Sequence, residues 1–528
     1  MTQRRPNVLF LLSDQHNYRC LSRLAGDRAE PVHTPALDNL SENGTVFEQT
    51  YCPSPLCAPS RMAMLTGRTV PRCGGWNNHS VLRPDLQTLP AAFSDAGYET
   101  CLVGKMHLGG TRQFVGFDHR PYGDLTGGAG HQHEPLLDSL NVTKGLGKDT
   151  APVVYDRDWR KRQLTSVGRT EFPESALQET IVLRESLSFL REHDHRASET
   201  PWLLCASFSR PHPPFTAPAR HLERYWPDGV TDPRRTETSN FPLSSRLAEW
   251  YEVDSLAIEE VRKARAAYFA CIDYLDELLG EMLVLLESAG FLENTVVVYA
   301  SDHGEMMGEH GLFEKRTWYE DSARVPWILQ TPHQRSGSAP ASTVDTPVSL
   351  ADLFPTLAEL ADIPYPDDLD GDSLAEAVQE GEEPDRAPVV YDYLQPRFGE
   401  ARQYRAIRNG RYKFVGFRGE SNLLFDLETD PDEVHNLAAD PSPAIADVLD
   451  RCESMFASSI SFDTIDRRRI EDASLQDEYR LDIPPGHGNA YHMPDGRLVD
   501  AESPLYQPNV LAESVTSALE TTTRRDEP

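Results

Sequence analysis

Four apolar runs of strand length lie far apart along the chain, and each is followed at once by polar residues able to do chemistry. Helical stretches separate the runs, an alternation typical of a largely parallel sheet covered by helices. Ligands of an open α/β sheet bind beyond the carboxyl ends of its strands. We therefore predict an α/β fold with a large mixed, mostly parallel sheet between layers of helices and a functional site at one sheet edge. The runs are Val8–Leu12, Thr100–Val103, Trp202–Ser207 and Thr295–Ala300, and the residues behind them are Asp14-Gln15, Lys105-Met106-His107, Arg210-Pro211-His212 and Asp302-His303.

The pattern changes after about residue 388. Four short runs separated by turns predict a small antiparallel sheet there, closed by a helix near Ser442–Ala457. Upstream, apolar residues at spacings of three and four predict one long helix over Ser255–Ala289, ended by Gly290. We predict a catalytic unit over residues 1–378, a smaller α+β unit over 389–460 and a polar extension over 461–528 whose end is disordered by composition. The four short runs are Val389–Tyr393, Tyr404–Asn409, Arg411–Phe417 and Asn422–Leu427.

The chain of 528 residues is strongly acidic, with a formal net charge of −32. Nucleic acid and anionic membranes would be repelled, so neither is expected as a partner. An anionic substrate would need a locally positive pocket, which draws attention to the seven lysines. No apolar run approaches the ~20 residues of a membrane span, and the first apolar stretch is shorter than the roughly 7–15 residues of a signal-peptide core. We expect a cytoplasmic protein, and eight cysteines without a CxxC pair do not indicate a disulfide framework.

The segment Cys57-Ala58-Pro59-Ser60-Arg61 is the most specific signal in the chain. A Pro and a Ser just inside a helix start leave backbone N–H groups directed toward the Cys57 side chain, which suits a bound anion. Arg61, one turn further on, faces the same way. The segment resembles the Cys-x-Pro-Ser-Arg signature of the sulfatase family, in the alkaline phosphatase superfamily. That resemblance implies an alkaline-phosphatase-like fold and oxidation of Cys57 to formylglycine, an aldehyde that is hydrated to a diol. The plain alternative is a buried cysteine before an ordinary helix.

A metal site is predicted at the ends of two strands. Asp14 and Gln15 follow the first, Asp302 and His303 a later one, and hard divalent cations prefer such oxygen ligands. By the resemblance, Cys57 completes the set. The two Asp and Gln15 suit Ca²⁺ or Mg²⁺, with Ca²⁺ expected first, and His303 also admits Mn²⁺. Most sulfatases that the chain resembles carry Asp and Asn in place of Gln15 and His303, whereas the Gln/His variant occurs in a branch that includes phosphonate monoester and phosphodiester hydrolases. For Asp14 alone, a helix cap or turn is the alternative.

Lys105 and His107 are two residues apart, so on extended backbone both side chains would point the same way. The resemblance assigns Lys105 to the sulfate oxygens and His107 to a formylglycine hydroxyl, whereas phosphonate hydrolases carry Tyr and Thr there. It also assigns His212 and Lys315 to sulfate binding and to protonation of the leaving group, with Arg61 among the sulfate ligands. For Lys105 and His107, the alternative is an ordinary surface lysine and an ordinary core histidine. Asn78 and His310 are weaker candidates. His131 and His133 lie in a Gly-rich loop at the expected pocket mouth, and solvent-exposed loop histidines without a role are the alternative there.

The resemblance covers roughly residues 6–440 and is nearest to the choline-sulfatase and arylsulfatase-like branch. It implies a sulfuric ester hydrolase that cleaves R–O–SO₃⁻ to an alcohol and sulfate, acting on a small sulfated substrate. It further implies a formylglycine-generating enzyme as maturation partner, and a homo-oligomer stays open. Three alternatives remain: a phosphodiester or phosphonate monoester hydrolase of the same superfamily, a catalytically inactive anion-binding homologue, and a transferase that uses the same covalent chemistry.

Overall fold

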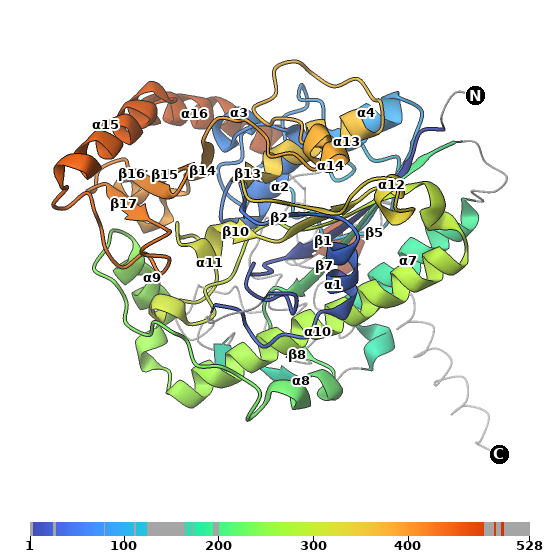
Figure 1. Ribbon diagram of the computed structural model, residues 1–528, viewed down its shortest axis with the longest axis horizontal. Helices are drawn as coiled ribbons and strands as arrows, with labels where there is room; N and C mark the ends of the chain where they lie inside the picture. Colours follow the sequence, from blue (N-terminus) through green and yellow to red (C-terminus); the bar gives the residue numbers. More distant parts are fainter. Residues whose placement is uncertain are drawn as a thin grey trace.

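A computed structural model describes residues 4–24, 28–78, 80–109, 112–123, 164–165, 167–170, 173–193, 200–479, 490–492 and 498–500. Its main feature is an eight-stranded sheet in the order β12-β2-β11-β9-β1-β7-β4-β5 (Figure 1). The four apolar runs predicted as strands are four neighbours in it, and β1 pairs in parallel with β7 and β9, as does β4 with β7. The predicted fold class is confirmed. The strands are β1 Asn7–Asp14, β4 Glu99–Gly104, β7 Trp202–Pro211, β9 Thr295–Ser301, β2 Thr45–Phe47, β5 His119–Tyr122, β11 Trp327–Gln330 and β12 Ser342–Val344.

The main sheet is buried on both faces, which is why its strands read as nearly continuous apolar runs. Alternate residues of β1 enter different cores: Val8 and Phe10 pack on one face, Leu9 and Leu11 on the other. In Figure 1 the helices α2, α4 and α13 lie on the first face, and α7 and the second half of α10 on the opposite one. The helices are α1 Pro35–Glu42, α2 Cys57–Thr66, α3 Val70–Cys73, α4 Leu89–Asp95, α7 Gln178–Glu192, α10 Ile258–Ser288 and α13 Leu353–Leu360.

A second, four-stranded antiparallel sheet follows in the order β14-β15-β16-β17. Its turn between β15 and β16 contains Gly410 with a φ of 55°, a left-handed value that glycine adopts without strain. Helix α15, Pro443–Ser458, packs on this sheet through Val448 and Cys452. The small sheet and its closing helix lie where the sequence predicts them. The strands are β14 Val389–Tyr393, β15 Tyr404–Asn409, β16 Tyr412–Phe417 and β17 Leu423–Asp426.

One further helix was not anticipated. Residues Phe462–Glu478, predicted only as the start of a polar extension, form α16. Its mean composition is polar, so no apolar stripe signals it, yet Ile465 is 1% exposed and belongs to the large core. Among the described residues, none of the helices is long and apolar enough to cross a membrane.

Candidate active site

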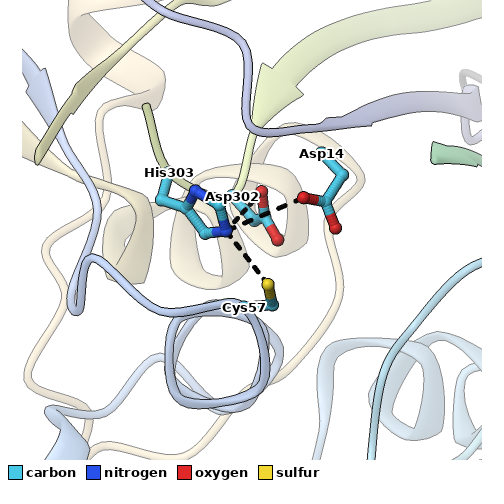
Figure 2. A group of neighbouring side chains, drawn as sticks. All are labelled: Asp14, Cys57, Asp302 and His303. Atoms are coloured by element: carbon cyan, nitrogen blue, oxygen red, sulfur yellow. Dashed lines mark hydrogen bonds and ion pairs between the residues drawn. The ribbon is translucent and has the colours of Figure 1, made fainter. Parts of the chain in front are cut away.

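The site lies at the carboxyl ends of β1 and β9, opposite the first turn of α2 (Figure 2). Four side chains meet there, each fully buried, and one ligand atom from each lies within 4.8 Å of the others. Cys57 Sγ is 3.1 Å from His303 Nε2. The same nitrogen lies 3.7 Å from Asp14 Oδ1 and 3.7 Å from Asp302 Oδ1. The arrangement therefore offers two carboxylates, an imidazole and a thiol to one point.

Strand register explains why the two carboxylates meet. β1 and β9 run in parallel with Ser13 opposite Ser301, so Asp14 and Asp302 are the next residues on neighbouring strands. Beyond Asp14 the chain turns sharply at Gln15, whose φ is 73°, and the Gln15 N–H donates to Asp302 Oδ1 over 3.1 Å. A left-handed non-glycine residue costs on the order of 1–3 kcal/mol. The turn is thus maintained by its surroundings, in which Gln15 is completely buried.

His303 is oriented by the backbone of the next residue. Its Nδ1 lies 3.0 Å from the carbonyl oxygen of Gly304, an arrangement in which Nδ1–H donates and Nε2 keeps its lone pair for the site. Gly304 makes this possible, because a Cβ there would lie 2.1 Å from the Asp321 carbonyl oxygen. Burial lowers the pKa of His303, which favours the neutral imidazole that binds metals.

Arg61 braces the carboxylates. Its Nε–H donates to Asp302 Oδ2 over 2.7 Å, and its Nη2–H to Asp14 Oδ2 over 3.1 Å. Its Nη1–H donates to the carbonyl of Lys105 at 2.8 Å and to Ser207 Oγ at 3.2 Å. The guanidinium is thereby committed to the protein, so its geometry supports a positioning role more than the expected direct contact with sulfate.

Two lysines supply positive charge. Lys105 Nζ lies 2.8 Å from Asp14 Oδ2, and neither side chain is exposed. Lys315 Nζ donates to Gln15 Oε1 and is 2% exposed. Both neighbours of Lys315 have left-handed backbone, with φ of 63° at Glu314 and 81° at Arg316. Two of the seven lysines of an acidic chain therefore meet at this one site, as an anionic substrate requires.

The charges of the site shift its pKa values. Burial by itself would raise the pKa of Asp14, but Lys105, with His212, Arg61 and His303, holds it well below its usual range. Burial, helped by Asp14, raises the pKa of Cys57 to about 11, so the unmodified side chain is a neutral thiol at neutral pH. Burial and the two lysines lower the pKa of His212 well below its usual value. His212 is thus a neutral imidazole in the free protein, with Nδ1 2.8 Å from the Pro213 carbonyl.

The residues present fit a divalent cation. Asp14 Oδ1 is buried and accepts no hydrogen bond from the described part of the chain, although it faces His303 across the cluster. An unsatisfied buried carboxylate oxygen is costly unless a ligand completes it. Two carboxylates and one imidazole, with the side chain of Cys57 beside them, form a donor set for a hard or borderline cation. The structure thus contains a candidate metal site at the predicted place.

The remaining candidates divide. Asn78 lies at the start of α2, where its Oδ1 accepts the Ala58 N–H over 3.2 Å. His107 is 3% exposed, but its φ is 57°, so the extended backbone assumed for Lys105 and His107 is wrong: β4 ends at Gly104. His310 stacks on Tyr319 at 4.0 Å and is surrounded by Asp321 and other charges of a separate network. His131 and His133 lie outside the described residues.

Sequence reasoning missed Glu305. This buried carboxylate accepts hydrogen bonds from Gln15 Nε2, from the Met307 N–H at 3.0 Å and from the Glu314 N–H at 2.6 Å. It therefore orients the Gln15 amide so that Oε1 faces Lys315 and the site. The only signal in the sequence was an acidic residue directly behind Asp302-His303-Gly304.

Comparisons with known proteins point to one family. Residues 6–363 match the family profile described as sulfatase, and residues 308–456 match the C-terminal region of N-sulphoglucosamine sulphohydrolase. A choline-sulfatase of Rhizobium meliloti is 33% identical over 84% of this chain and 84% of its own length. An arylsulfatase of Clostridium perfringens is 30% identical over 82% and 90%.

Solved structures share the fold. The phosphonate monoester hydrolase of Agrobacterium radiobacter superimposes with a TM-score of 0.67 at 24% identity, over 86% of this chain and 95% of that one. A protein solved with its substrate D-glucosamine-2-N,6-O-disulfate gives a TM-score of 0.65 at 23% identity, over 90% and 99%. At these identities the likeness concerns the fold alone.

Proposed function

This chain belongs to the sulfatase family and is a sulfuric ester hydrolase; on that premise we propose that Cys57, converted to formylglycine, is its nucleophile. The observation that carries the proposal is the position of Cys57. Cys57 is the first residue of α2, a helix that is buried throughout. Its Sγ lies 3.1 Å from His303 Nε2, beside two carboxylates. A helix N-terminus also favours negative charge, which a sulfate ester brings.

We propose that Asp14, Asp302, His303 and the modified Cys57 bind a divalent cation, together with the nearby amide of Gln15. Ca²⁺ is the first choice because all of these donors except the His303 imidazole would be oxygen atoms. When bound, such a cation would withdraw charge from sulfate oxygens and acidify a hydroxyl that it contacts. Arg61 would hold both carboxylates in place for it, and Glu305 the amide of Gln15.

The side chains around Cys57 suggest how the ester is cleaved. Lys105 and Lys315 would face the non-bridging sulfate oxygens, where negative charge grows in the transition state. The leaving alkoxide needs a proton, and we assign its donation to Lys315 because His212 is neutral in the free protein. His107 is proposed to remove a proton from a formylglycine hydroxyl. The diol matters because expelling sulfate needs a second hydroxyl on the same carbon, which serine lacks.

Mass spectrometry tests the nucleophile. Conversion of Cys57 to formylglycine lowers the mass of its peptide by about 18 Da, and an unmodified peptide in active native protein would contradict the proposal. Cys57→Ser is expected to accumulate a sulfate ester on the introduced hydroxyl without turnover. Cys73→Ser is the matched control, because Cys73 is equally buried and its Sγ–H donates to the Val70 carbonyl. Sustained turnover by Cys57→Ser would overturn the mechanism.

Substrate class is the second part of the proposal. Lys105 beside Asp14 favours a small sulfate monoester, with aryl sulfates and choline sulfate as the first probes. The fold likeness to phosphonate monoester hydrolases motivates the direct comparison, in which an aryl sulfate and an aryl phosphodiester of the same phenol are offered to one preparation. A higher kcat/KM for the diester would favour the phosphohydrolase alternative.

The metal is tested by removal and replacement. Chelation is expected to abolish activity and to lower the melting temperature, because the Asp14 and Asp302 carboxylates then remain buried without a cation. Adding Ca²⁺, Mg²⁺ or Mn²⁺ separately, and measuring the midpoint shift as well as the rate, identifies the preferred ion. Equal recovery with all three would argue against selectivity for Ca²⁺.

Burial also bears on maturation and location. Cys57 has no exposed surface, so we propose that a formylglycine-generating enzyme acts on it before folding is complete. A cytoplasmic location is proposed as well, and it is supported by the eight cysteines, which are all buried and form no disulfide. Formylglycine content is compared between newly synthesised, pulse-labelled chain and folded protein that still carries Cys57, each exposed to the generating enzyme. Cell fractionation tests the location.

A further inference from the structure

We propose that helix α16 belongs to the catalytic unit, because it clamps the loop that aligns the first turn of α2. Residues 74–78 and 80 form this loop, the Trp76 loop. The proposal goes beyond the reaction itself and rests on the proposed role of Cys57. It assigns a positioning function to Asp472 and Trp76, which lie 396 residues apart.

The first step is the contact between α16 and the Trp76 loop. Asp472 Oδ2 accepts the indole N–H of Trp76 over 2.9 Å, and the Trp76 side chain belongs to the large core. A Cβ on Gly74 would lie 2.9 Å from the same Oδ2, so an alanine there would require the Asp472 side chain to shift. Arg468 adds a hydrogen bond of 3.2 Å to the Pro71 carbonyl in α3. Figure 1 shows α16 beside α3.

The second step is the contact between the Trp76 loop and α2. Asn78 Oδ1 accepts the Ala58 N–H over 3.2 Å, one residue beyond Cys57. Gly75 lies against the same turn, since a Cβ there would be 2.9 Å from Pro59 Cα. The loop therefore supplies the side-chain acceptor that caps α2 and packs against its first turn, in a helix whose N-cap residue Leu56 has no side-chain cap.

The Trp76 loop also contacts the segment that contains Lys105 and His107. Ser80 Oγ accepts the N–H groups of Trp76 and Asn77 at 2.9 and 3.0 Å, which closes the loop on itself. The Ser80 carbonyl in turn accepts the Gly109 N–H over 3.0 Å, two residues beyond His107. One loop thus links α16 to both Cys57 and the Lys105–His107 segment.

A further contact lies at the end of α16. The Arg112 guanidinium is 5.7 Å from the ring centroid of Tyr479 and donates to the Leu82 carbonyl over 2.6 Å. The chain just beyond the loop is thereby linked through Arg112 to Tyr479, the residue that follows α16. Misplacing a reacting group by about 1 Å can cost on the order of 100-fold in rate. A small displacement of the first turn of α2 after loss of the α16 contact would therefore lower turnover.

A double-mutant cycle in the full-length protein tests the coupling. Asp472→Ala is expected to lower kcat/KM about 3- to 10-fold, mainly through kcat. In an Asn78→Ala background the same change is expected to cost less than about 2-fold, because the clamp acts through Asn78. Asp466→Ala is the matched control: it removes an α16 ion pair of 2.6 Å with Arg418, which lies beside the small sheet instead. That variant is expected to lower the melting temperature with kcat/KM changed less than about 2-fold.

Hydrogen exchange gives a second readout that needs no activity. Asp472→Ala and Trp76→Phe should each speed exchange of the Trp76, Asn77 and Gly109 amides, whereas Asp466→Ala should not. Two results would overturn the proposal. One is additive effects of Asp472→Ala and Asn78→Ala on kcat/KM, with activity still measurable in the double variant. The other is unchanged amide exchange in the Trp76 loop. Formylglycine content, measured on the same samples, separates failure of the clamp from failure of the Cys57 assignment.

Discussion

The Nε–H of Arg61 donates to Oδ2 of Asp302 over 2.7 Å, and neither side chain has any exposed surface. The same guanidinium reaches Asp14 on the neighbouring strand and the carbonyl of Lys105 behind β4. One residue of α2 thereby ties together the ends of three strands of the main sheet. Only arginine carries donors in the fork needed for this many contacts.

Arg61→Lys is expected to weaken metal binding about 10- to 100-fold, the usual effect of losing a group that orients metal ligands. A lysine keeps the charge but can reach at most part of the set formed by Asp302, Asp14 and Lys105. Calorimetric titration of chelated protein with Ca²⁺ measures the change. Arg68→Lys, which disturbs an ion pair with exposed Asp368 instead, should leave the affinity alone. Unchanged affinity in Arg61→Lys would refute the bracing role.

Glu305→Gln is expected to reduce metal affinity and kcat together. Three N–H groups donate to this carboxylate, and an amide would turn a donor toward at least one of them. The Gln15 amide would then lose its fixed orientation. Glu309→Gln offers a comparison, because Glu309 is as deeply buried but pairs with Arg19 and Arg265. It should lower the melting temperature without altering the metal titration, and identical titrations of both variants would contradict the assignment.

Lys315→Ala should harm substrates with poor leaving groups most. If Lys315 protonates the departing alkoxide, its loss costs roughly 100- to 10,000-fold for alkyl sulfates. A nitrophenyl sulfate, whose phenolate leaves without a proton, should lose much less. The measurement is kcat/KM across a series of sulfates with leaving groups of graded pKa, for wild type, Lys315→Ala and His212→Ala. A uniform loss across the series would assign Lys315 to sulfate binding only.

Asp276 should make stability depend on pH. Burial raises its pKa from the ordinary 3.8 to about 7, although the Ala36 and Leu37 N–H groups at the start of α1 both donate to it at 2.9 Å. Asp38 and Asp273 raise the value further. The native state therefore holds more protons than the unfolded state between pH 3.8 and about 7, so the contribution of Asp276 to stability falls as pH rises through that window.

The comparison with Asp276→Asn isolates this effect, which at about three pKa units amounts to at most about 4 kcal/mol. In the variant an NH₂ group replaces one carboxyl oxygen and faces a backbone N–H, so it should be less stable than wild type at pH 4. The gap should be wider at pH 4 than at pH 8, as measured by urea unfolding. A constant gap would show that the two N–H donors outweigh burial at Asp276.

Local patterns were enough to predict the framework of the fold. Apolar runs such as Val8–Leu12 mark strands buried on both faces, and the residues directly behind them occupy the sheet edge where Asp14 and Asp302 meet. Residues of one short motif, Cys57 to Arg61, are held by a single helix turn and needed no distant information. The C-terminal strands were predictable for the same reason, since their turns are encoded locally at Asn409-Gly410.

The sequence by itself determined which side chains reach the active-site edge, because strand polarity and the residues after each strand follow from local periodicity. Only the tertiary structure decided what those side chains do. The turn of Arg61 toward Asp302, the hold of Glu305 on Gln15 and the contact of Asp472 with Trp76 join residues 241, 290 and 396 positions apart. Such contacts arise from the packing of whole elements, and polar partners with no periodic signature leave no trace in a local pattern. For the same reason α16 read as a polar extension until its place beside α3 gave its side chains partners.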